Sequence, residues 1–199
     1  MCGTPFGSFG DSAAGMGGAG SPVDICGACR QRKPVFTYAR SAGRYDGALR
    51  EALHAFKFSG KTTLAVPLAE LIAEQCAGAL PAPVDLVVAV PLHRARERER
   101  GFNQSALLAA RLARALDAPF QGRALRRVRA TLAQADLTGR ERRDNVRGAF
   151  AADRDAVTGR HVLLVDDVLT TGATVSECAR VLMAAGAASV GIVTVARVV

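Results

Sequence analysis

The chain has 199 residues, 49% of them apolar, and a formal net charge of +8. This length suits one domain with a full core, or one domain with a small appendage. No apolar run approaches the roughly 20 residues needed to cross a bilayer, and the first residues lack the basic and apolar regions of a secretion signal. We therefore expect a cytoplasmic protein without membrane insertion.

The positive charge comes almost entirely from arginine, because lysine is rare. A basic chain favours a nucleic-acid partner. The arginines, however, gather at 94–100, 123–129 and 140–147, and such groups suit small phosphorylated ligands as well as polymers. Charge alone leaves both kinds of partner open.

The N-terminal segment, 1–36, is distinct from the rest and forms a candidate unit of its own. It contains a low-complexity stretch rich in glycine and alanine at 7–21, which is typical of a flexible linker. Cys26 and Cys29 have the spacing of metal ligands, and Cys2 followed by glycine resembles the end of a second knuckle. An odd cysteine count without a secretion signal argues against a disulfide scaffold.

The second unit, 37–199, alternates between helical and strand patterns. Cys76 and Cys178 fall in helical, alanine-rich contexts, and we expect both to be inert buried thiols. We expect helices at 46–58, 64–80, 103–116, 138–150 and 174–185, strands at 84–90, 161–165 and 189–198, and a short strand within 119–128.

Alternating strands and helices, with continuous apolar strand runs, predict a mainly parallel sheet covered by helices on both faces. In such α/β sheets, ligands bind outside the carboxyl ends of the strands. Two loops begin at these ends, one at 91–104 after the strand at 84–90 and one at 166–174 after the strand at 161–165.

The second loop, DDVLTTGAT, combines two acids with a turn that leads into a helix. Free backbone N–H groups and the positive end of the helix dipole favour a phosphate there, and Gly172 lets the backbone approach closely. Asp166 and Asp167 are acceptors, so they suit sugar hydroxyls or a divalent cation. A ribose 5-phosphate satisfies both requirements.

Other hypotheses for the acids are weaker. An acid pair also ends Walker B strands, and AFKFSGKTT at 55–63 nearly spells the phosphate loop of a nucleotide triphosphatase. Its required first glycine is Ala55, however, and a helical pattern precedes it where a strand is needed. A plain turn capped by Thr174 is the remaining structural alternative.

Residues 162–174, VLLVDDVLTTGAT, closely resemble the motif of type I phosphoribosyltransferases that binds phosphoribosyl pyrophosphate (PRPP). Three further segments, at 45–61, 90–109 and 129–150, resemble parts of the ComF/GntX branch of that group and occur in the same order. The resemblance covers about residues 24–199. It implies the type I phosphoribosyltransferase fold, an α/β fold with a mainly parallel sheet flanked by helices and a small N-terminal zinc-ribbon segment.

The resemblance also implies the roles of individual residues. The acids would hold the ribose of PRPP with Mg²⁺, and a nucleophile would displace pyrophosphate; no residue stands out as a general base. The 5-phosphate would lie against Thr170, Thr171, Gly172, Ala173 and Thr174, and the pyrophosphate against Leu92, His93, Arg94, Arg98 and Arg100.

Members of this family have a zinc ribbon with four cysteines. Here Cys2, Cys26 and Cys29 would supply three ligands, and the fourth, expected three residues before Cys2, is missing. Either the start codon is misplaced or the site is degenerate, so we expect at most an incomplete Zn²⁺ site.

Two functions from different classes follow. The first is a PRPP-dependent phosphoribosyltransferase of ComF type, whose acceptor the sequence does not reveal. The second is a binding module that keeps the fold but contacts single-stranded DNA, and other competence proteins, during natural transformation. Aromatic side chains for stacking bases are scarce, at 5% of residues, which favours the first.

Overall fold

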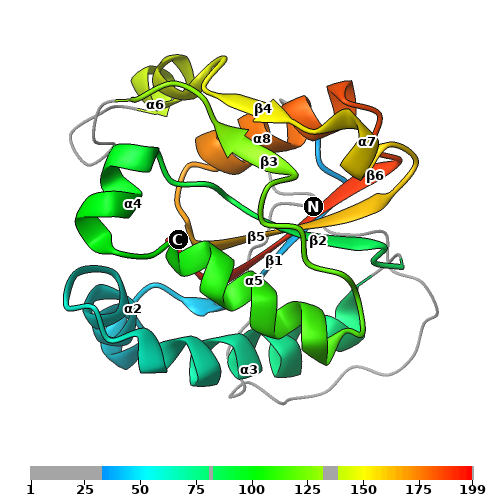
Figure 1. The fold of residues 1–199 in the computed structure, drawn as a ribbon. Coiled ribbons are helices and arrows are strands. Elements are labelled where there is room, and N and C mark those ends of the chain that lie inside the picture. Colours follow the sequence, from blue (N-terminus) through cyan, green and yellow to red (C-terminus); the bar gives the residue numbers. More distant parts are fainter. Residues whose placement is uncertain (1–32, 81–82, 132–138, 199) are drawn as a thin grey trace.

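The computed structural model describes residues 33–80, 83–131 and 139–198. Its centre is a sheet of four parallel strands in the order β1-β6-β5-β2 (Figure 1). The strands are β1 (Tyr38–Arg44), β2 (Leu86–Ala89), β5 (His161–Leu169) and β6 (Ser189–Arg197). Because all four run in the same direction, their carboxyl ends lie along one edge of the sheet.

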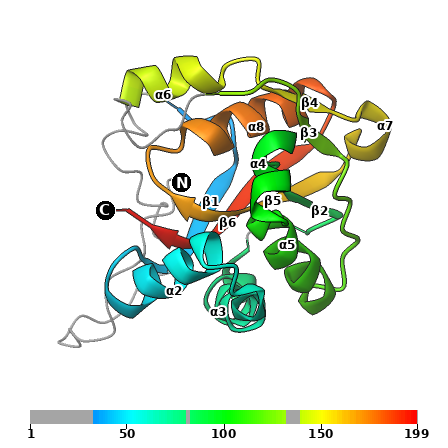
Figure 2. The ribbon, with the colours of Figure 1, turned by 60° about the vertical axis from the view of Figure 1, so that its left-hand side comes forward.

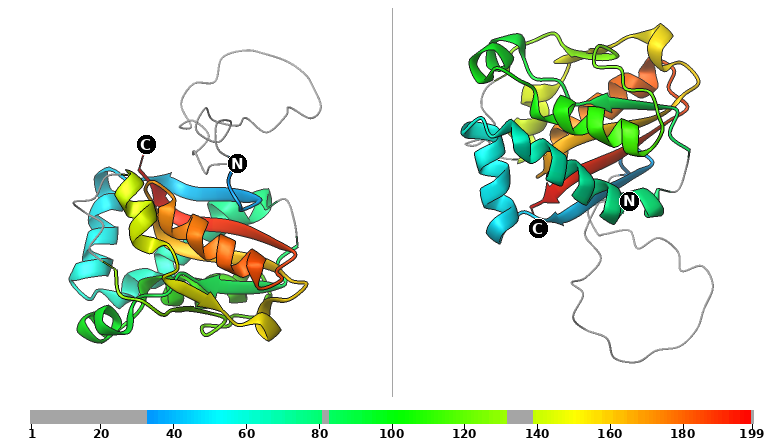
Figure 3. Two further views of the ribbon diagram at one scale, coloured as in Figure 1. Left: turned by 90° about the horizontal axis from the view of Figure 1, so that it is seen from above. Right: turned by 60° about the horizontal axis from the view of Figure 1, so that its bottom comes forward.

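Helices cover both faces of this sheet, as the alternating pattern predicts. The helices α3 (Ala65–Cys76) and α5 (Gln104–Ala115) pack on one face, and α8 (Ala173–Ala184) packs on the other (Figure 3). The helix α2 (Gly47–Phe58) follows β1 directly and lies on the same side as α3 (Figure 2).

Short elements complete the α8 side and the connections. The antiparallel pair of β3 (Leu125–Arg127) and β4 (Phe150–Ala152) packs near α8, as does α6 (Gly139–Val146). The remaining short elements are α4 (Arg94–Arg100), α7 (Arg154–Val157) and two 3₁₀ turns, η1 (Thr62–Leu64) and η2 (Ala77–Ala79).

Successive side chains of the buried strands point to opposite faces of the sheet and belong to two apolar clusters, one on each face. Leu164 of β5 packs with Leu182 of α8, whereas its neighbour Leu163 belongs to the cluster that contains Leu108 of α5 and Ile72 of α3. This explains why the central strands are apolar at consecutive positions, since neither face is open to water.

The connections fix where a ligand site belongs. The chain leaves β2 towards α5 on one face, and it leaves β5 towards α8 on the opposite face. The carboxyl ends of β2 and β5 are adjacent, with the Val90 amide donating to the Val165 carbonyl at 2.9 Å. A crevice opens at such a switch point in open α/β sheets, and both loops singled out in the sequence begin there.

Most of the expected elements are confirmed, with three kinds of difference. The segment 94–100, expected to be part of a loop, is the helix α4, which His93 and Gly101 flank as caps. Strand β5 continues to Leu169 because β6 pairs with it along its full length, so the acid pair lies inside the strand. Strand β1 was not expected, nor were β4 and α7.

The sequence pattern does not predict strand β1, because this segment contains no long apolar run. It relies on pairing with β6 and on the close packing of Tyr38 over Gly191. A Cβ atom at Gly191 would lie 2.2 Å from Cζ of Tyr38, so glycine is required there for the tyrosine ring to fit.

Some expectations concern residues that the structure leaves out. Cys2, Cys26 and Cys29 lie outside the described residues, so the partial zinc site and the division at 36/37 stay predictions. Cys76 and Cys178 are free and buried, as expected. Within the described ranges, no helix is long and apolar enough to span a membrane.

Candidate functional site

The acid pair lies near the carboxyl end of β5, against the first turn of α5. Asn103 fixes this helix, because its side-chain oxygen accepts from the Ser105 amide at 3.0 Å and its amide nitrogen donates to the Val90 carbonyl at 3.1 Å. The N-cap thus ties the start of α5 to the end of β2. It leaves Gln104 and Ser105, both buried, facing the acids.

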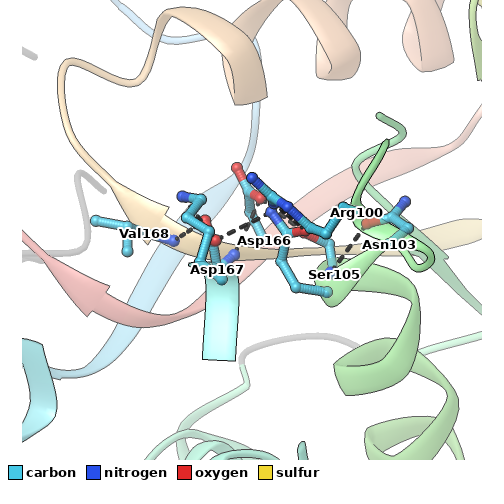
Figure 4. Close-up of polar contacts among 8 residues, drawn as sticks. Arg100, Asn103, Ser105, Asp166, Asp167 and Val168 are labelled. Atoms are coloured by element: carbon cyan, nitrogen blue, oxygen red, sulfur yellow. Dashed lines mark hydrogen bonds and ion pairs between the residues drawn. The ribbon is translucent and has the colours of Figure 1, made fainter. Parts of the chain in front are cut away.

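Asp166 is partly exposed and has one engaged oxygen. Its Oδ1 accepts from the Ser105 hydroxyl at 2.9 Å and from the Asp167 amide at 3.0 Å (Figure 4). Within the described part of the chain, Oδ2 has no hydrogen-bond donor. Asp166 therefore offers a fixed carboxylate with one oxygen available to a ligand.

Asp167 is buried and has both oxygens engaged. Its Oδ1 accepts from the Val168 amide at 2.7 Å, and Oδ2 accepts from the Gln104 side chain at 3.1 Å. Lys57 of α2 forms an ion pair with the same Oδ2 at 2.9 Å. The side chain of Asp167 is only 7% exposed, so this acid is bound from within the protein.

The environment shifts the proton affinity of these groups. Burial, and then the negative charge of Asp167, raises the pKa of Asp166 to about 7, although Lys57 and the Ser105 hydrogen bond oppose the shift. Burial alone would lower the pKa of Lys57, but the charge and hydrogen bond of Asp167, together with Asp166, outweigh it and raise that pKa. Lys57 is accordingly charged at neutral pH.

The turn after β5 has the geometry of an anion site. Gly172 is the N-cap of α8 with φ 76, a left-handed conformation that favours glycine, and it has no side chain of its own to cap the helix. Ala173 donates only a long 3.4 Å hydrogen bond to the Thr171 hydroxyl, and Thr170 and Thr171 are exposed. The N–H groups of the first turn are oriented as a phosphate requires.

The residues predicted for pyrophosphate separate into two groups. Leu92 and His93 follow β2, and His93 caps α4, on which Arg94 and Arg98 are exposed. Arg100 instead turns towards the acids: it donates to Oε1 of Gln104 at 2.7 Å, and its guanidinium lies 5.5 Å from the ring centroid of Phe58. The structure thus places Arg100 beside the acid pair and apart from Arg94 and Arg98.

Two cationic residues at the site were missed by sequence analysis. Lys57 lies between two phenylalanines in a helix that looked purely structural. Arg127 of β3 is half-buried, its buried Nε has no hydrogen-bond partner within the described residues, and its side chain packs on Phe150. Burial lowers the pKa of Arg127, and the charges of Asp166 and Arg96 also act on it. Arg127 belongs to the arginine group at 123–129 that the sequence indicated for anion binding, but nothing local singled it out, and the segment 45–61 carried no local sign of the role of Lys57.

The phosphate-loop hypothesis for 55–63 is excluded. This segment forms the end of α2, a turn and η1, so a helix leads into it where a phosphate loop requires a strand. Its exposed Lys61 is not the lysine that meets the acids. Among the described residues, no group of three or more histidine, cysteine or acidic side chains is placed to hold a metal ion.

Comparisons with known proteins agree with this geometry. A profile of the phosphoribosyl transferase domain matches residues 103–198. DNA utilization protein YhgH of Salmonella typhi is 40% identical over 177 residues, which are 86% of this chain and 77% of that protein. Competence protein F of Haemophilus influenzae is 32% identical over 179 residues, 86% of this chain and 78% of that protein.

Solved structures are more distant. Orotate phosphoribosyltransferase from Aeropyrum pernix is 23% identical, with a TM-score of 0.42 over 68% of this chain and 60% of that one, which supports no statement about function. The parallel sheet, the matched domain and the relatives do agree with one another: the chain belongs to the ComF/GntX family and has the type I phosphoribosyltransferase fold.

Proposed function

We propose that this protein binds PRPP with Mg²⁺ at the carboxyl ends of β2 and β5 and transfers its phosphoribosyl group to an acceptor. The observation that carries the proposal is the position of the acids on β5 just before the first turn of α8, which begins at a left-handed Gly172. One ligand, a ribose bearing a 5-phosphate, meets both sets of groups.

On the sugar side, Asp166 has an acceptor oxygen for a ribose hydroxyl, and Ser105 and the Asp167 amide hold that carboxylate still. A fixed acceptor loses little freedom when the ligand binds. Carboxylate oxygen is also the kind of ligand that Mg²⁺ prefers, so the available oxygen of Asp166 fits a metal that arrives with PRPP. The bound metal would neutralise charge on the pyrophosphate.

On the pyrophosphate side, the segment of Leu92 and His93 and the exposed arginines of α4 supply donors and positive charge. Arg127 adds a half-buried guanidinium that donates to the Thr131 hydroxyl and lacks a carboxylate partner within the described residues. Guanidinium groups match phosphate oxygens in geometry and charge. Positive charge at this place would stabilise pyrophosphate as it leaves.

The reaction would replace one bond at the anomeric carbon of the ribose. The bond from that carbon to a pyrophosphate oxygen breaks, a bond to the nucleophile forms, and the nucleophile loses its proton to water. Holding the sugar between the acids and α8 contributes orientation.

Thermal unfolding with candidate ligands tests the proposal. A ligand present at a hundred times its Kd stabilises a protein by about 2.7 kcal/mol, so PRPP with Mg²⁺ should raise the Tm clearly. Pyrophosphate release can then be followed with a panel of nucleobases and amines. A Tm that PRPP with Mg²⁺ leaves unchanged would contradict the proposed binding.

A second candidate is a binding module for single-stranded DNA that works with other competence proteins. It is favoured by the exposed arginines of α4 and by the names of the relatives, a DNA utilization protein and a competence protein. An oligonucleotide that raises the Tm when PRPP does not would favour this module. Phosphate contacts would make its binding fall steeply with salt.

A further inference from the structure

Lys57 reaches the acid pair from a different part of the chain. It lies in the last turn of α2, where the fully buried ring of Phe56 anchors the helix in the core. Its ammonium group contacts Oδ2 of Asp167 at 2.9 Å, and its side chain remains 30% exposed. The ion pair with Asp167 therefore holds the ammonium in place, while part of the lysine side chain stays accessible from the site.

The ammonium has more donors than the protein uses. Lysine has three N–H donors, and within the described residues Asp167 is the one acceptor that Lys57 meets. A partly buried ammonium with unused donors is costly unless water or a ligand accepts from them. The ribose hydroxyl oxygens of a phosphorylated sugar are suitable acceptors.

Asp167, in contrast, has little capacity left to accept hydrogen bonds from a ligand. Its oxygens accept from Val168, Gln104 and Lys57, and the side chain is almost fully buried. A ligand could reach it only by displacing one of these donors. Asp166 differs, because one of its oxygens has no such donor in the described structure.

We infer that Lys57 is a ligand-binding residue of this site, which Asp167 positions so that the ammonium meets the ribose of the ligand beside Asp166. The inference rests on the proposed function and divides the work of the acid pair. Asp166 contacts the sugar directly, and Asp167 acts through Lys57.

Calorimetry with PRPP and Mg²⁺ tests this on the full chain. Lys57→Met should weaken binding about tenfold or more, the effect of losing one charge-assisted hydrogen bond. Lys57→Arg keeps the charge and should recover most of the affinity. Ribose 5-phosphate should follow the same order, whereas inorganic phosphate, held by the start of α8, should bind all variants alike.

A double variant separates positioning from direct contact. If Asp167 acts through Lys57, Asp167→Asn weakens PRPP binding no further when Lys57→Met is already present. The double variant also leaves no unpaired buried charge, so it remains informative where Asp167→Asn alone fails to fold. Lys61→Met, a change of an exposed lysine beyond the end of α2, is the matched control and should change nothing.

Each contrary result has a distinct meaning. Tighter PRPP binding by Lys57→Met would show that Lys57 blocks the site, and unchanged binding would show that the ion pair is only structural; both overturn the inference. A further loss from Asp167→Asn in the Lys57→Met background would show that Asp167 contacts the ligand itself. If the unaltered protein binds neither PRPP nor ribose 5-phosphate, the proposed function fails and the inference fails with it.

Discussion

The two sides of the candidate site treat charge in opposite ways. On the sugar side, the Asp167 carboxylate accepts from both Lys57 and Gln104 without any ligand. On the pyrophosphate side, Arg94, Arg96 and Arg98 are exposed on α4 and meet no carboxylate among the described residues. The sugar side is preorganised to orient a ligand. The arginines of the pyrophosphate side, in contrast, are neutralised only by a bound ligand.

This difference predicts how each side responds to change. A paired, partly buried charge is little screened by salt, and removing one partner exposes the other to a large penalty. An exposed arginine interacts weakly and is strongly screened. Substitutions on the sugar side should therefore cause large, salt-independent losses of ligand affinity, and those on α4 should cause small, salt-dependent ones.

The largest effect should come from the phosphate turn that both sides share. Gly172→Val forces a branched side chain into a left-handed conformation, φ 76, and places it where the phosphate approaches the start of α8. We expect affinity for PRPP and for inorganic phosphate to fall more than about a hundredfold, two charge-assisted bonds or more, measured by calorimetry.

The matched control is Gly159→Val, in a turn at the opposite edge of the sheet with a similar φ of 71. It imposes the same backbone strain without touching a ligand group. It should lower the Tm and leave phosphate affinity intact. Equal loss of phosphate binding in both variants would attribute the effect to strain alone.

The second-largest loss of ligand affinity is expected on the sugar side. Asp166→Asn replaces an acceptor oxygen with a donor and removes the charge that suits Mg²⁺. PRPP affinity should fall about ten- to a hundredfold, while inorganic phosphate, which never reaches the ribose subsite, binds as before. Loss of both ligands in parallel would mean that the acid holds the turn and not the sugar.

The acid pair and the phosphate turn were predictable because they are contiguous: strand, acids, turn and helix follow one another within residues 161–184. Lys57 was not predictable, because its partner Asp167 lies in a distant part of the chain and only the packing of α2 brings them together. A lysine in the last turn of a helix is ordinarily a solvated side chain.

On the pyrophosphate side, the helix α4 could not be predicted from the sequence either. The helix α4, RARERER, has no apolar stripe, so its periodicity indicates nothing. What makes it a helix is capping by His93, whose ring accepts from the Ala95 amide, and the left-handed Gly101 at its end. These caps turn Arg100 towards Gln104 and away from Arg94 and Arg98.

A smaller effect is expected on the pyrophosphate side. Arg98→Gln removes one exposed charge and should weaken PRPP binding about two- to fivefold at low salt, with the difference fading at higher ionic strength. Ribose 5-phosphate should bind unchanged. Arg114→Gln, at the far end of α5 and equally exposed, is the control. A salt-independent loss for Arg98→Gln would place that side chain in a buried contact.

The smallest expected effect is the dependence of stability on pH. Burial and the neighbouring Asp167 raise the pKa of Asp166 to about 7, from its ordinary value of 3.8, so the folded, ligand-free protein binds this proton more tightly than the unfolded chain. The stabilisation that results is complete below the unfolded pKa, near 4, and is lost as the pH rises through about 7.

Asp166→Asn cannot titrate, so the Tm of this variant relative to the unaltered protein should increase between pH 5 and 8. Affinity for PRPP should behave oppositely, because the sugar and Mg²⁺ need the ionised carboxylate: it should rise through neutral pH in the unaltered protein more than in Asp166→Asn, where only the ligand titrates. Thermal unfolding and calorimetry at matched ionic strength measure both trends. Parallel Tm curves for the two proteins would show that Asp166 is ionised throughout this range, so that both sides of the site would hold their charge at any physiological pH.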